Sequence, residues 1–293
     1  MRVLYSTNHT LFEKQDTYSL RGICMLLIIM HHVYHYLAND YGVVWENSLF
    51  SYCINSAGYW STGCFFLLSG YGLNLSLKSK ELNLLYVKTH LQKLILPYLY
   101  AYAINIVLTG NLSMFSQGWF FKTILAIYVI SFIIYHFIKN QKLRLTIVSS
   151  IIIAYIIYAN AYLGLMHYYT NSVICFPIGI LCGMSFPTEQ KKYYPFILLC
   201  FGFVLFVGLE KIGFSYADYI LAILFSFICI YITSILNVTC CLLDYIGKNS
   251  IVFYVLQIAL LEPMLKIESP WIYGIGVFVV IYTLAYIYTR WRN

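Results

Sequence analysis

Arg21 and His32 are the pair of side chains whose types and spacing most directly suggest chemistry. They lie eleven residues apart in one apolar segment, LRGICMLLIIMHHVYHYL. At about 100° per residue, eleven steps bring both side chains to one face of a helix, roughly 16 Å apart along its axis. Ionisable groups inside such a segment are expensive and are commonly kept for function. Two interpretations are open: acid–base chemistry at His32, or an interfacial anchor at Arg21 with a packing histidine.

His32 is suited to act as a base because an imidazole away from water favours its neutral form, which can accept a proton. The neighbouring His31 and His35 are four residues apart, a spacing that can hold a metal ion. A third ligand is missing nearby, since Asp40 would reach them only if the helix end bent back. We therefore predict a catalytic His32 and no metal.

A second apolar segment, GCFFLLSGYGLNLSLK, carries small and hydroxyl residues near its polar end. Ser69, Gly70, Tyr71 and Gly72 would allow another helix or a ligand to approach closely, and their hydroxyl groups could bind either. Helix packing is the simpler of these two interpretations.

A basic stretch, YVKTHLQKLILPYLY, opens the next apolar segment. Lys88, His90 and Lys93 come just before Pro97 and are suited to bind phosphate groups that arrive from the cytoplasm. Anchoring to anionic lipid headgroups is the competing interpretation.

The composition predicts an all-α integral membrane protein, because 61% of the residues are hydrophobic and 10% are charged, against about a quarter charged in soluble domains. Ten apolar runs approach the roughly twenty residues that cross a bilayer. We expect about ten transmembrane helices, with approximate centres at Ile28, Phe66, Ala101, Ile130, Ile153, Ile178, Phe203, Phe225, Leu256 and Val279. The sixth run is the weakest, because Pro177, Gly179 and Gly183 would kink or loosen it. The nine cysteines form no CxxC pair and are interpreted as small buried hydrophobes.

The distribution of basic residues predicts that both termini are cytoplasmic. With the amino terminus inside, fifteen of the 18 lysines and arginines fall on the cytoplasmic side, and only Lys122, Lys211 and Lys266 fall outside. This asymmetry accounts for the net charge of +7 without a nucleic-acid partner. No loop is long enough for a soluble domain, so we expect a single transmembrane domain over residues 1–293.

Taken together and in their order along the chain, these segments resemble the acyltransferase-3 family of membrane acyltransferases. The family's motifs are matched by Arg21 and His32, by Phe65, Phe66, Ser69, Gly70 and Tyr71, by Lys93 and Pro97, by Trp119 and Phe120, by Phe176 through Gly183, and by Gly247, Lys248, Ser250 and Tyr254. The chain departs from the family's pattern at two places. It has Gln257 where members often carry His, and Thr89, His90 and Lys93 where they often carry Arg.

The resemblance implies a membrane O-acyltransferase that moves an acyl group, most often acetyl, from a cytoplasmic acyl-CoA such as acetyl-CoA to a hydroxyl of a cell-surface or exported glycan. His32 would act as general base or would carry the acyl group covalently, and Arg21 would position the donor. The further residues implied are Lys88, Lys93, Ser69 and Tyr71 for the donor, and His35, Trp119, Tyr254 and Gln257 as acceptor-binding or supporting groups. Outer-loop residues rich in aromatic and amide groups could also contact a sugar, namely Tyr41, Trp45, Asn47, Tyr52, His167 and Tyr168.

We expect the protein in the cytoplasmic membrane of a bacterium, in contact with acyl-CoA, a glycan and membrane lipid, and the sequence is compatible with a homo-oligomer. Two alternatives remain open at this stage. One is a transporter or export component for polysaccharide that uses the polar face of the first span, and the other is a non-catalytic relative that serves as a partner subunit. Thiol release that depends on the acceptor would separate the enzyme from both.

Overall fold

The computed structural model describes most of the chain and contains only helices in that part. No strand occurs among the described residues, which confirms the all-α prediction. The described residues are 14–43, 49–79, 83–110, 118–162, 170–185, 193–214, 216–236 and 240–292.

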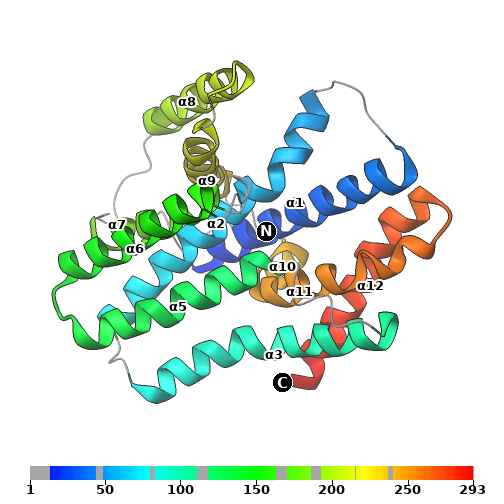
Figure 1. Cartoon of the computed structure of the whole chain (residues 1–293), viewed down its shortest axis with the longest axis horizontal. Coiled ribbons are helices and arrows are strands. Elements are labelled where there is room, and N and C mark those ends of the chain that lie inside the picture. The colour runs from blue at the N-terminus through cyan, green and yellow to red at the C-terminus, as the bar shows by residue number, and fades with distance from the viewer. Residues whose placement is uncertain are drawn as a thin grey trace, which may run out of the picture.

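The helices follow one another through short connections and form a bundle (Figure 1). In chain order they are α1 (Lys14–Tyr41), α2 (Leu49–Ser79), α3 (Leu84–Thr109), α5 (Trp119–Phe137), α6 (Gln141–Ala161), the 3₁₀ helix η2 (Asn171–Ile174), α7 (Cys175–Ser185), α8 (Tyr193–Lys211), α9 (Ala217–Leu236), α10 (Cys241–Lys248), α11 (Ser250–Leu260), the 3₁₀ helix η3 (Pro263–Lys266) and α12 (Pro270–Arg292).

Five of the described helices are long and apolar enough to cross a membrane: α1, over Asp16–Tyr41, and α3, α5, α6 and α12. Shorter apolar helical stretches occur at Asn171–Met184, Ala217–Thr233 and Ser250–Leu260. Each of the ten centres expected from the sequence falls within a helix. The count of ten crossings and the side on which the termini lie stay predictions. The weak sixth run forms only the 11-residue helix α7, preceded by η2.

Helix α2 lies inside the bundle and packs against α1, α7 and α9. Its contact with α7 depends on two glycines. A Cβ added at Gly70 would overlap the carbonyl oxygen of Phe176, and one added at Gly179 would overlap the carbonyl oxygen of Leu67. The two backbones therefore touch, as small residues at membrane helix contacts allow.

Helix α10 packs against the start of α1 in the same way. A Cβ at Gly22 would overlap the carbonyl oxygen of Leu243, and one at Gly247 would overlap that of Tyr18. Helix α10 ends just before Asn249, and the chain continues as α11, which packs against α1, α3 and α12. Two of the motif glycines, Gly70 and Gly247, thus bring helices together rather than bind a ligand.

Helix α3 carries the basic stretch and has defined ends. Asn83 precedes it, and its side-chain oxygen accepts a hydrogen bond of 2.8 Å from the backbone N–H of Tyr86, which is the usual role of an N-cap residue. Gly110 follows it at a φ of 68°, a conformation that glycine adopts without strain. Pro97 lies inside the helix and is buried.

Candidate active site

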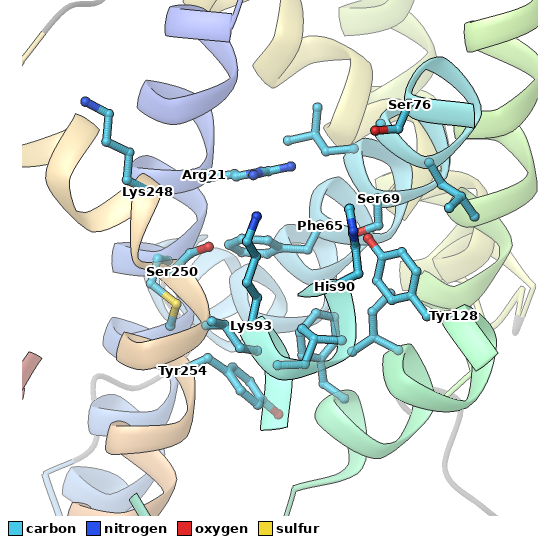
Figure 2. A pocket seen from close by; sticks show the side chains of 18 residues that line it. Arg21, Phe65, Ser69, Ser76, His90, Lys93, Tyr128, Lys248, Ser250 and Tyr254 are labelled. Atoms are coloured by element: carbon cyan, nitrogen blue, oxygen red, sulfur yellow. The ribbon is translucent and has the colours of Figure 1, made fainter. Parts of the chain in front are cut away.

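A pocket opens between α1, α2, α3, α5, α10 and α11, and its volume is about 400 Å³, within the usual range for small-molecule sites. It is lined by Arg21, Met25, Phe65, Leu68, Ser69, Gly72, Leu73, Ser76, His90, Lys93, Leu94, Phe120, Ile124, Tyr128, Lys248, Ser250, Ile251 and Tyr254. Segments from the start, middle and end of the chain therefore form one site (Figure 2).

Three cationic side chains line this pocket, and no carboxylate does so among the residues described. Figure 2 shows Lys93, from α3, pointing toward the guanidinium of Arg21, from α1. Lys248 lies at the rim, with its Nζ 5.2 Å from the centre of the Tyr18 ring. Like charges held together without a counter-charge favour binding of an anion. The half-buried guanidinium can bind phosphate oxygens through two parallel hydrogen bonds.

The rest of the lining is largely apolar. Met25, Leu68, Phe120 and Ile124 contribute to this part, and Leu68 and Ile124 are themselves buried. The Phe120 ring is packed against Tyr254, with ring centres 4.9 Å apart. The pocket thus combines cations with a hydrocarbon interior, so it suits a ligand that joins an anionic part to a less polar arm.

Two polar groups in the pocket, Tyr128 and Ser76, were not singled out from the sequence. Tyr128 faces Ser69 across the pocket, and their hydroxyl groups interact (Figure 2). Ser76 lies seven residues after Ser69, which places the two on one face of α2 two turns apart. That spacing was a usable signal for Ser76. For Tyr128 the sequence offered none, because α5 is apolar on several sides.

Helix spacing explains which basic residues of α3 reach the pocket. His90 and Lys93 are three residues apart and line it together, whereas Lys88 is exposed and does not line it within the described structure. Five residues separate Lys88 from Lys93, a rotation of about 140° around the helix. The His90 ring is held by its Nδ1, 3.2 Å from the carbonyl oxygen of Tyr86. A donor-binding role for Lys88 stays a prediction.

Tyr71 is likewise separated from Ser69 by the geometry of α2. The two are two residues apart, a rotation of about 200°, and only Ser69 lines the described pocket. Tyr71 is half-buried on the side of α7, where its backbone lies against Gly179. Its predicted contact with the donor also stays a prediction.

His32 lies beyond the pocket on the face of α1 that carries Arg21 and Met25, and it does not line the pocket as described. The intervening Ile28 on this face is 1% exposed and does not line the pocket as described. The half-buried His32 ring is 5.0 Å from the ring of His31, centre to centre.

The two flanking histidines have separate partners. The Nδ1 of His31 is 3.1 Å from the carbonyl oxygen of Ile54, and its ring lies against Gly58 of α2. His35 is exposed, and its Nδ1 is 3.0 Å from the side-chain nitrogen of Asn39. Within the described part of the chain, no group of three or more His, Cys, Asp or Glu residues is arranged to hold a metal ion.

The last family motif ends at Tyr254 in the pocket, and the nearby Gln257 lies in the core. Tyr254 lines the pocket, whereas Gln257, one turn further along α11, is fully buried. Neither polar atom of the Gln257 amide has a hydrogen-bond partner among the described residues. Trp119 does not line the pocket described, but its ring is 6.1 Å from that of Phe120, which does.

A family model described as an acyltransferase domain matches residues 19–290. The chain belongs to the acyltransferase-3 family. No curated protein and no solved structure matches it. Every residue that lines the pocket lies within the matched range.

The outer residues expected to bind a sugar are divided between described and undescribed parts of this acyltransferase domain. Trp45, Asn47, His167 and Tyr168 lie outside the described residues. Tyr41 is described, and its hydroxyl donates to the carbonyl oxygens of residues 265 and 267 at 3.3 and 2.5 Å. The hydroxyl of Tyr52 donates to a carboxylate oxygen of Glu210, while the Nζ of Lys211 lies 4.3 Å from the centre of the Tyr52 ring.

Proposed function

We propose that the protein is a membrane O-acyltransferase that moves an acetyl group from cytoplasmic acetyl-CoA to a hydroxyl of a cell-surface or exported glycan. The observation that carries the proposal is the pocket itself. In a chain of the acyltransferase-3 family, Arg21, Lys93 and Lys248 line a cavity whose other residues are mostly apolar and include no carboxylate in the described lining. Acyl-CoA joins an anionic phosphate part to a less polar thioester arm, which is the pairing that this cavity suits.

The donor would bind with its phosphates at the cationic side and its thioester arm in the apolar interior. Arg21 is the strongest candidate for direct phosphate contact, because its planar group binds two oxygens at once. Lys93 and Lys248 would add point charges, and the hydroxyl of Ser69 would contact the arm. The charge distribution of the sequence supports a cytoplasmic opening, since it assigns Arg21, Lys93 and Lys248 to the inner side.

His32 would serve as the general base. It would take the proton of the acceptor hydroxyl while the acceptor oxygen bonds to the thioester carbon. The carbon–sulfur bond then breaks, and the leaving thiolate takes up a proton, which gives an ester and free coenzyme A. A well-placed base contributes about 10²- to 10⁴-fold in rate. Because His32 does not line the described pocket and the intervening Ile28 is buried, the reaction requires side chains along α1 to move when donor or acceptor binds.

The remaining features of the proposal concern the whole chain. We infer one membrane domain over residues 1–293, ten spans with both termini in the cytoplasm, and residence in a bacterial cytoplasmic membrane. The five helices that are long and apolar enough to cross a bilayer support membrane insertion, and the fifteen-to-three bias of basic residues supports this orientation.

The test is release of free thiol by the purified protein in detergent or lipid nanodiscs. With acetyl-CoA and a polysaccharide from the cell that makes the protein, we expect thiol release that depends on the polysaccharide, and an acetyl-sized mass increase of the product. Surface glycans from cells with and without the chain, compared by mass, identify the natural acceptor. A protein that moves glycan across vesicles without consuming acetyl-CoA would overturn the proposal.

A further inference from the structure

Gln257 is the one side chain in the described structure with two buried polar atoms that lack a hydrogen-bond partner. It is 0% exposed, and both its Nε2 and its Oε1 have no hydrogen-bond partner among the described residues. Buried amides are nearly always hydrogen bonded, because an unpaired one loses its bonds to water and gains nothing in return. An amide unpaired at both ends therefore indicates a partner that the described part of the folded chain does not supply.

The other buried amide side chains in the described structure differ from Gln257 in this respect. The Nδ2 of Asn105 donates to the carbonyl oxygen of Ala259 at 3.1 Å. The side-chain oxygens of Asn74 and Asn171 accept hydrogen bonds from Gln141 and Ser172. Each of the three is thus bonded at one polar atom or more.

The position of Gln257 on α11 places it next to the pocket. Ser250, Ile251 and Tyr254 line the pocket from this helix. Residues three apart share a helix face, so Gln257 continues that lining face one turn past Tyr254. It lies about 10 Å along the axis from Ser250.

Helix α1 runs beside α11 in the same direction. Near the pocket, Gly22 of α1 lies against Leu243 of α10, which leads into α11. At the far ends, the Tyr273 ring is 5.4 Å from that of Tyr41 at the end of α1, and its hydroxyl donates to the carbonyl oxygen of Leu261 just after α11. His32 lies about 16 Å beyond Arg21 on α1. Gln257 therefore occupies a level between the pocket and His32.

We propose that the amide of Gln257 donates a hydrogen bond to the carbonyl oxygen of the acyl group during transfer. The inference rests on the proposed function and assigns a specific catalytic residue to it. When the acceptor oxygen bonds to the thioester carbon, the carbonyl oxygen gains negative charge, and the Nε2–H of Gln257 stabilises it. The oxygen regains its double bond as the carbon–sulfur bond breaks, and the leaving thiolate takes the proton that His32 removed from the acceptor.

A neutral amide is suited to this task. It needs no counter-ion in an apolar interior, and donors fixed in place before charge develops are worth more there than in water. The missing hydrogen bonds of Gln257 are then explained by catalysis, because the partner of its amide is present only while substrate is bound.

The decisive variant is Gln257→Leu, which keeps most of the volume and removes the amide. We expect kcat for acetyl transfer to fall about 10²- to 10³-fold, the effect of losing one donor to an oxyanion, with KM for acetyl-CoA within about twofold of wild type. We also expect the melting temperature in detergent to stay level or rise, since an unpaired polar group has been removed.

The matched control is Asn105→Leu, at an amide whose partner is part of the protein. This change leaves the carbonyl of Ala259 without its donor, so we expect a lower melting temperature and an unchanged kcat per folded molecule. Gln257→Met separates donation from size, because its unbranched side chain is close to glutamine in length and has no N–H, so it should lose as much kcat as the leucine variant. Gln257→His restores a ring donor and should recover part of the rate.

Two results would overturn the inference. One is a Gln257→Leu protein with wild-type kcat. The other is a Gln257→Leu protein that loses melting temperature and kcat together, because the amide would then support packing. Wild-type protein assayed in parallel separates this failure from that of the proposed function. If the wild type binds acetyl-CoA but releases no thiol with any acceptor, the acyltransferase proposal fails and takes the role of Gln257 with it.

Discussion

The two ends of the Arg21–His32 face of α1 are built differently. At the Arg21 end, side chains from six helices surround an open pocket that is rich in positive charge. At the His32 end, the ring is packed beside His31, which is itself fixed to the backbone of α2 at Ile54. One helix thus carries an accessible binding site and, three turns away, a histidine that the described pocket does not reach.

This difference indicates that donor binding and group transfer make separate demands on the protein. In the proposed reaction the donor enters from the cytoplasm, which fits the open pocket at the Arg21 end. The reacting carbonyl must be kept from water, since hydrolysis of the thioester would waste it. Variants at the two ends should therefore affect different kinetic constants.

The largest effect is expected at the closed end. His32→Ala should lower acceptor-dependent thiol release by about 10²- to 10⁴-fold, because it removes the base. Binding of acetyl-CoA, measured by calorimetry, should be unchanged, and so should the yield of protein in the membrane. The exposed His136 on α5 provides a control for loss of an imidazole. If the His32→Ala protein still acylates the acceptor, His32 is not the catalytic base.

The open end should show smaller effects, confined to the donor. Arg21→Gln and Lys93→Gln should each weaken acetyl-CoA binding about 10- to 100-fold, since a hydrogen bond to a charged group contributes about 1.5–3 kcal/mol.

Lys88→Gln tests the sequence-based prediction that Lys88 binds the donor. Because Lys88 does not line the described pocket, we expect this variant to change acetyl-CoA affinity by less than about twofold. The exposed Lys139 serves as the charge control. Equal losses at Lys88 and Lys93 would show that the pocket is not the phosphate site.

The close contact between α2 and α7 supports the pocket at the Arg21 end. Gly70→Ala should lower the free energy of unfolding by about 1–3 kcal/mol, the usual cost of overpacking, because the added carbon meets the carbonyl of Phe176. Gly208→Ala on α8 is the matched control, since nothing lies within 4 Å of its added carbon. There alanine should stabilise the helix by up to about 1 kcal/mol. Thermal unfolding of both variants in detergent gives the comparison, and equal stabilities would contradict it.

The smallest effect is expected at the carboxyl-terminal end of α1. Tyr41→Phe removes a hydroxyl that donates to the carbonyls of residues 265 and 267. We expect a loss of about 1 kcal/mol in unfolding free energy and no change in acetyl-CoA affinity. A change in donor affinity would show that the two ends of α1 are coupled, which would weaken the division between them.

The apolar runs predicted the helices well, because membrane-length hydrophobic stretches allow few alternatives to a helix. The basic stretch was predicted as a unit, but only part of it lines the pocket. Spacing alone could have separated Lys88 from Lys93, and it could have favoured His90, which shares a face with Lys93. The position of Tyr128 depends on how α5 packs, and no local pattern in the sequence reports that.

The glycine contacts between α1 and α10 also affect the charges beside them. Gly22 adjoins Arg21 in the sequence, and Gly247 adjoins Lys248, so two backbones in direct contact hold two cations in place. Mutual repulsion can then bend the side chains but cannot slide the helices apart without breaking that contact. The repulsion between the like charges is offset during folding and membrane assembly, before any ligand binds. We therefore expect an anionic ligand to be attracted to cations whose backbone positions are already fixed before it binds.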